Sequence, residues 1–161
     1  MKKLLFIAVF VITGLGTVNA QKGSFNAGVN LGLPIGDNSN INSLGISVEA
    51  NYLFDVSDKF KVGPSISYLH YLGKDNVLGK SSSFLPIAAA GRYSVSEKLT
   101  LGADLGYGIG ISPGDQEGAP YYRPMVGYTI SEKIMLQATY TAMSKEGFTM
   151  SNLGVGAMIS L

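Results

Sequence analysis

The chain has 161 residues, of which 14% are charged, with no cysteine and a formal net charge of +1. The lack of cysteine excludes disulfides, thiol catalysis and cysteine metal sites. The slight basic excess is contributed by the first residues of the chain, so the charge gives no support to nucleic-acid binding.

The first twenty residues have the layout of a secretory signal peptide. Lys2 and Lys3 precede an apolar run over residues 4–12, and small residues end the segment at Ala20. A membrane anchor helix is the alternative, but polar residues and glycines interrupt the run before the ~20 apolar residues that a span needs. We predict cleavage after Ala20, giving a signal peptide (residues 1–20) and a barrel domain (residues 21–161) with 10 basic and 11 acidic residues.

The rest of the chain alternates between apolar and small or polar residues in eight stretches. The clearest runs from Leu99 to Ile111, where every second residue is apolar and the residues between are Thr, Asp or Gly. This period of two is that of a β-strand. Pro64 removes one ladder hydrogen bond, and Ala88 to Ala90 blur the alternation. The predicted strands cover roughly residues 24–33, 43–54, 60–68, 84–95, 99–111, 122–130, 134–142 and 153–161.

The two faces of these strands differ in a way that indicates a membrane. One face carries Leu, Ile, Val and Tyr, while the other is largely glycine and polar residues. A transmembrane barrel turns its apolar face outward to lipid and its polar face inward. We therefore predict an all-β fold, an eight-stranded antiparallel up-and-down transmembrane β-barrel. A secreted soluble barrel with an apolar ligand is the alternative, and it requires bulky apolar residues inside.

The predicted connections are of two alternating kinds. Three short turns repeat the order apolar, Ser, acid, Lys, apolar, over residues 56–60, 95–99 and 130–134. Serine and acidic side chains suit tight turns because they bond their own backbone. The other connections are mostly longer and rich in Gly, Asn, Asp and Ser. Short turns on one side and longer loops on the other are typical of membrane barrels, with the short turns in the periplasm.

Aromatic residues gather near strand ends, where the two membrane interfaces of a barrel lie. We predict a belt at each interface. The belt near the short turns contains Tyr52, Phe54, Phe60, Tyr93 and Tyr128, and the belt near the longer loops contains Tyr68, Tyr71, Phe84, Tyr107, Tyr121, Tyr122, Tyr140 and Phe148.

Together these features resemble the small outer-membrane β-barrel proteins, such as outer membrane protein X and the transmembrane domain of outer membrane protein A. The resemblance covers residues 21–161. It implies a cell outer membrane location and a last strand read by the barrel-assembly machinery. Gly156, Ile159 and Leu161 match that signal in position, whereas Leu161 is not aromatic and Gly154 stands where a polar residue is usual.

Charged residues on the inward face form a candidate lumen charge network. Strand parity places Glu49, Lys61, Arg92, Asp104 and Arg123 inside, where charges must be paired or hydrated. Pairing the fourth and fifth strands about their short turn puts Arg92 opposite Gly102 and diagonal to Asp104. The leading hypothesis is a structural or surface-contact scaffold whose lumen is filled by side chains. A small pore passing ions or small solutes is the alternative, favoured by the inward glycines.

The sequence gives little indication of an enzyme, and we predict no catalytic, cofactor or metal site. His70 is the only histidine, and a lipid-modifying hydrolase using it with Ser81, Ser82 or Ser83 and Asp75 is a remote alternative without a spacing signature. Asp115, Glu117 and Glu146 are loop acids of the kind that are usually solvated. The expected partners are outer-membrane lipid and the assembly machinery, with no nucleic acid and a monomeric state.

Overall fold

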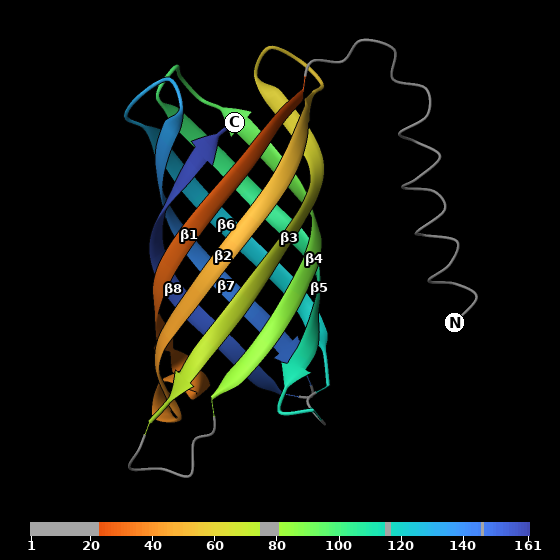
Figure 1. The fold of residues 1–161 in the computed structure, drawn as a ribbon, viewed down its shortest axis with the longest axis vertical. Coiled ribbons are helices and arrows are strands. Elements are labelled where there is room, and N and C mark those ends of the chain that lie inside the picture. Colours follow the sequence, from red (N-terminus) through yellow and green to blue (C-terminus); the bar gives the residue numbers. More distant parts are fainter. Residues whose placement is uncertain (1–22, 75–80, 115–116, 146) are drawn as a thin grey trace, which may run out of the picture.

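A computed structural model of the chain describes residues 23–74, 81–114, 117–145 and 147–161, with the backbone alone described at Asn38 and Phe148. Its eight strands form one closed barrel (Figure 1). Each strand pairs antiparallel with the next, and the last pairs with the first over residues 151–160 and 26–35. The predicted antiparallel up-and-down barrel is confirmed. The predicted signal peptide and cleavage site lie outside the described residues.

The strands account for most of the described chain. They are β1 (Gly23–Ile35), β2 (Asn42–Asp55), β3 (Phe60–Gly73), β4 (Ser82–Ser94), β5 (Leu99–Ser112), β6 (Ala119–Thr129), β7 (Ile134–Lys145) and β8 (Phe148–Ser160). A short 3-10 helix, η2 (Gly36–Asn40), follows β1. No helix among the described residues has the length and apolar character to cross a membrane.

Several strands extend beyond the predicted limits, and the longest extensions are toward the longer loops. β3 continues to Gly73, β6 begins at Ala119 and β8 begins at Phe148. The alternation of apolar and polar residues fades in these extensions, although the backbone ladder continues through them. An apolar–polar alternation appears only where the two faces of a strand differ in burial. It therefore misses strand residues where both faces carry the same kind of side chain.

Strand faces alternate between the interior and the outside as predicted. Val155 is 68% exposed on the outer surface, whereas its neighbour Gly154 is buried. The run of alanines in β4 follows the same rule, because Ala88 and Ala90 are buried and Ala89 is exposed. The alternation in this strand is therefore intact and was obscured in the sequence only because one residue type occupies both faces.

The three short turns have the same hydrogen-bond geometry. The Oγ atom of Ser57 accepts the Phe60 backbone N–H at 3.1 Å, Ser96 Oγ accepts that of Leu99 at 3.1 Å, and Ser131 Oγ accepts that of Ile134 at 3.2 Å. These turns lie at one end of the barrel, with the starts of β1 and β7 and the C-terminus (Figure 1). The serine in the repeated turn sequence thus fixes the hairpin by capping the next strand. We call this the short-turn end and the opposite one the loop end.

Candidate functional site: the barrel interior

A layer of paired charges crosses the middle of the lumen. Arg92 Nη1 donates to Asp104 Oδ1 at 2.6 Å, and Arg123 Nε donates to Asp104 Oδ2 at 3.0 Å. Arg123 Nη2 lies 2.7 Å from Asp104 Oδ2 and also contacts the Glu49 carboxylate. Two guanidinium groups and two carboxylates balance to zero net charge, as buried charges require. The register sets this contact between the strands, because Arg92 lies opposite Gly102 on β5.

Two amide side chains complete the layer. Asn30 donates to Glu49 Oε1 at 3.0 Å, and Gln137 donates to Asn30 Oδ1 at 2.8 Å and to Glu49 Oε1. Their strands, β1 and β7, bring the layer to the opposite wall of the barrel from β4. Asn30 and Gln137 were not among the residues predicted for the lumen network. Their inward parity and polar character were the available signals, but only the closed barrel brings residues this far apart in sequence together.

Lys61 lies apart from the other four predicted network residues. Its Nζ is 3.0 Å from Asp55 Oδ1, and its side chain is 39% exposed toward the short-turn end. In the register it sits directly opposite Arg92. Like charges repel, so the Lys61 ammonium pairs with an acid on β2 instead. The central charge layer, defined as Glu49, Arg92, Asp104 and Arg123 with the two amides, does not include it.

An apolar cluster fills the lumen between the charge layer and the loop end. The rings of Tyr71 and Phe84 meet edge to face with centroids 6.4 Å apart, and Tyr71 has no exposed surface. The loop-end cluster comprises Leu69, Tyr71, Phe84, Ala88, Ala119, Tyr121 and Met143, with Met150 packed against it. A second set of buried side chains therefore lies in the lumen, separate from the charges.

This cluster corrects the prediction of the loop-end aromatic belt. Tyr71, Phe84 and Tyr121 face the interior and not the membrane interface. In the β3–β4 register Tyr71 lies opposite Ser82, which is also buried. Tyr121 precedes Arg123 by two residues on the same strand, so both side chains point to the same face. Strand parity, rather than position near a strand end, decides which way these three rings point. Tyr68, Tyr107 and Tyr122 do lie on the outer surface, whereas the Phe148 side chain is outside the described set.

Inward glycines make room for side chains from neighbouring strands. A Cβ on Gly102 would stand 2.6 Å from Arg92 Cδ and 2.8 Å from Met125 Sδ, and one on Gly108 would stand 2.5 Å from Met143 Sδ. These distances are well below van der Waals contact. Space vacated at each glycine is thus occupied by a larger neighbour. The inward glycines, which favoured a pore in the sequence, instead permit a filled lumen.

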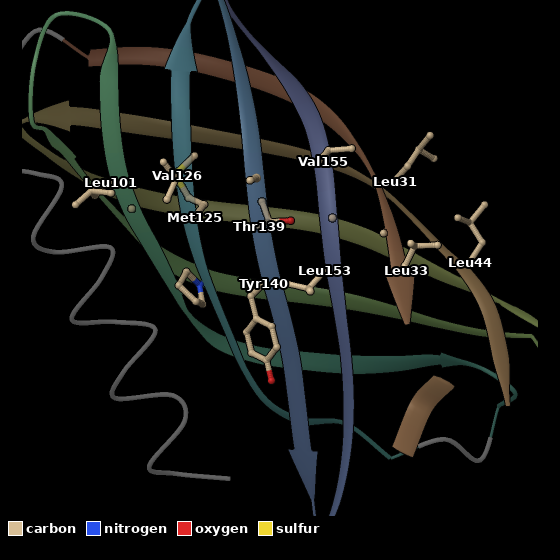
Figure 2. A pocket seen from close by; sticks show the side chains of 15 residues that line it. Leu31, Leu33, Leu44, Leu101, Met125, Val126, Thr139, Tyr140, Leu153 and Val155 are labelled. Carbon is tan, nitrogen blue, oxygen red and sulfur yellow. The ribbon is translucent and has the colours of Figure 1, made fainter. Parts of the chain in front are cut away.

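The outer surface is continuous and apolar across the middle of the barrel. A shallow groove of about 800 Å³ runs over β5 to β8 and onto β1 and β2. Figure 2 shows the Val126, Val155 and Leu31 side chains on this face, each on a different strand. A large exposed apolar surface on a folded chain marks contact with something other than water.

The only histidine contacts one of the three predicted serines. His70 Nδ1 lies 2.8 Å from Ser83 Oγ, which also accepts a hydrogen bond from the Tyr68 hydroxyl at 2.9 Å. Ser82 is buried on the inner side with Tyr71, and Ser81 Oγ accepts the Gly73 N–H at 3.3 Å. Asp75 lies outside the described residues. Within the described part of the chain, the serine and histidine have no acidic third member to orient the imidazole.

The loop acids do not assemble in the described residues. Glu117 pairs with Lys145, joining the segment before β6 to the end of β7. Asp115 and Glu146 fall outside the described part of the chain. Across the described ranges, no three His, Asp or Glu side chains lie close enough together to hold a metal ion.

Comparison with known proteins identifies the fold. No protein-family model and no curated protein sequence matches the chain. The attachment invasion locus protein Ail of Yersinia pestis superposes with a TM-score of 0.63 at 14% identity, covering 89% of this chain and 100% of that one. Neisserial surface protein A gives 0.60 at 15% identity, covering 88% and 100%.

A third match is to a designed protein, which shares no ancestor with natural barrels. A de novo designed transmembrane β-barrel superposes with a TM-score of 0.59 at 17% identity, covering 89% of this chain and 100% of the design. Natural and designed barrels thus share the same closed topology with this chain. Taken with the apolar exterior and the polar, filled interior, the comparison assigns the chain the fold of the small eight-stranded outer-membrane β-barrels.

Proposed function

We propose that this protein is an integral outer-membrane barrel with a structural or surface-contact role and a lumen closed by side chains. The observation that carries the proposal is the central charge layer. Each residue comes from a different strand, and the layer joins β1, β2, β4, β5, β6 and β7 across the interior. Cross-lumen ties of this kind hold the strands of a barrel in register.

Two features support a closed lumen over a pore. The charge layer carries no net charge and its four ionic side chains are buried. The loop-end cluster adds aromatic and methionine side chains above it. An ion crossing the barrel would have to displace both layers, and small eight-stranded barrels have interiors that side chains can fill.

The outer surface and the last strand support the expected partners. Exposed Leu, Ile and Val side chains suit outer-membrane lipid, and the last strand suits recognition by the barrel-assembly machinery. Since β1 and β8 pair with each other, the described strands leave no open sheet edge for a second copy to extend. A monomer embedded in the outer membrane, with its longer loops facing the medium, fits these features.

Single-channel recording tests the scaffold against the pore. The protein is refolded into lipid vesicles, its insertion is checked by gel migration without boiling, and the vesicles are fused to a planar bilayer. We expect no current steps in 1 M KCl, a concentration at which even small pores conduct. The Debye screening length at this concentration is about 3 Å. Discrete current steps that scale with salt concentration would establish the pore instead.

A further inference from the structure

A polar cavity occupies the short-turn end of the lumen. Its volume is about 220 Å³, enough for about seven waters at the ~30 Å³ that each occupies in the liquid. Its walls include serine, threonine and asparagine side chains and charged residues of the short turns. We call this space the short-turn cavity.

Two of the cations that line this cavity already have anionic partners. Arg92 pairs with Asp104 at 2.6 Å, and Lys61 pairs with Asp55 at 3.0 Å. An ion that leaves bulk water for such a space loses hydration without gaining an opposite charge. The short-turn cavity therefore suits small neutral solutes that form hydrogen bonds, such as water and hydrogen peroxide.

Two methionines stand directly opposite each other in the wall of this cavity. Met135 and Met158 pair in the β7–β8 register, and both line the cavity. Met135 is half-buried, whereas Met158 is only 4% exposed. The Met135 thioether lies over the lumen face of Gly127, because a Cβ on that glycine would overlap Met135 Sδ. The lack of a side chain at position 127 thus makes room for a thioether in the cavity wall.

The other described methionines do not line the short-turn cavity. Met125 and Met143 are 4% and 2% exposed, and Met143 belongs to the loop-end cluster. Met150 packs against the same cluster, at the opposite end of the barrel. Among the described methionines, Met135 is therefore the one that combines a partly exposed side chain with a place in this cavity.

We propose that Met135 is a site of reversible oxidation by a peroxide that enters the short-turn cavity. A lone pair of Met135 Sδ attacks one peroxide oxygen, and an S–O bond forms as the O–O bond breaks. The departing hydroxide takes the proton from the sulfur-bound oxygen and leaves as water. The methionine is oxidised to its sulfoxide while the peroxide is reduced, and a methionine sulfoxide reductase restores the thioether.

This chemistry depends on the short-turn cavity and not on the rest of the lumen. The sulfoxide oxygen is polar and accepts hydrogen bonds, which the water in a polar cavity can donate. A buried sulfur inside the loop-end cluster has no such compensation, because its neighbours are apolar. The site is compatible with a scaffold and with a pore.

Hydrogen peroxide treatment tests the site. The protein is refolded into lipid vesicles, checked by gel migration without boiling, treated with peroxide and sampled over time for peptide mass spectrometry, which locates each sulfoxide. Met135 is expected to react at least about tenfold faster than Met125 and Met143, because the packed interior must open before those sulfurs react. Protein unfolded in urea is the reference, in which the three methionines should react at similar rates.

Two variants at one position test whether the cavity is the route. Thr129 lies opposite Met135 in the β6–β7 register and lines the same cavity. Thr129→Phe places a ring in the cavity and is expected to slow oxidation of Met135 roughly tenfold. Thr129→Val is the matched control, since a valine of nearly the same size leaves the cavity open. If Thr129→Phe does not fold, the comparison of Met135 with Met143 in the unmodified protein decides.

Two results would overturn the proposal. Oxidation of Met135 no faster than that of Met143 in the folded barrel would show that the cavity gives the thioether no access. Undiminished oxidation of Met135 in a correctly folded Thr129→Phe variant would exclude the cavity as the route.

Discussion

Arg92 and Asp104 form a buried ion pair of 2.6 Å across adjacent strands, and the same carboxylate also holds Arg123. Asp104 is thus the shared anion of two guanidinium groups. Most of the charge layer depends on it, because its loss leaves Arg92 with carbonyl partners alone and Arg123 with Glu49 alone.

Replacing Asp104 by Asn should therefore destabilise the barrel strongly. Breaking a buried ion pair on one side costs about 3–5 kcal/mol, because the remaining charge stays buried without its partner. The measurement is the free energy of unfolding from urea titrations in lipid vesicles. Asp58→Asn, in an exposed turn, is the control and should change it by no more than about 0.5 kcal/mol. Equal stability of the two variants would show that the layer is not structural.

Substitution of Gly106 should destabilise the barrel, because neighbouring backbone atoms leave no space for a side chain. A Cβ there would overlap the Ile87 carbonyl oxygen and approach the Ala88 backbone, neither of which can rotate away. Gly106→Ala should cost about 1–3 kcal/mol, as overpacking does. Gly91→Ala is the matched control in the neighbouring strand, since its Cβ would meet the Phe60 ring at an ordinary 3.7 Å. A loss of stability in Gly91→Ala as large as that in Gly106→Ala would refute the crowding argument.

A lysine on the outer surface should cost more in the middle of a strand than at a turn. Val155 and Ile130 are similarly exposed, at 68% and 55%, but Val155 lies within β8 and Ile130 beside a short turn. Charged side chains on the lipid face of a barrel cost about 2–4 kcal/mol at the midplane and about 0–1 near the interfaces. Val155→Lys should therefore be the more destabilising in vesicles. Equal costs would mean that this surface does not lie in a membrane.

The His70 and Ser83 pair should not hydrolyse lipid. Ser83 is buried beneath Tyr68 and His70, and the described residues supply no acid to orient the imidazole. Release of fatty acid from phospholipid vesicles should be the same with the protein, with Ser83→Ala and without protein. Release that depends on Ser83 would make the pair a catalytic site.

The sequence contained most of the fold because each strand of a membrane barrel has two contrasting environments. The alternation from Leu99 to Ile111 predicted β5 within one residue of its observed end. The repeated turns predicted the hairpin positions, since their serines bond locally and need no distant contact. Features determined within one hairpin are thus readable from the sequence.

Features that depend on closure of the barrel could not be read from the sequence. Asn30 and Gln137 meet only because β1 and β7 approach through the lumen, 107 residues apart in the chain. Tyr71 and Tyr121 share a face with lumen residues, yet an aromatic residue near a strand end serves equally well at a membrane interface. The strand pattern gives the direction of each side chain, whereas the size of the lumen decides which of them fill it.

We expect the exposed apolar surface of this closed barrel to lie in lipid. The most direct measurement refolds the protein into lipid vesicles and compares its gel migration before and after boiling, with circular dichroism on the same sample. A barrel embedded in lipid is expected to give a β-rich spectrum and a faster-migrating band in the unboiled sample, the signature of an intact barrel. A protein that is folded, monomeric and soluble without detergent or lipid would contradict it.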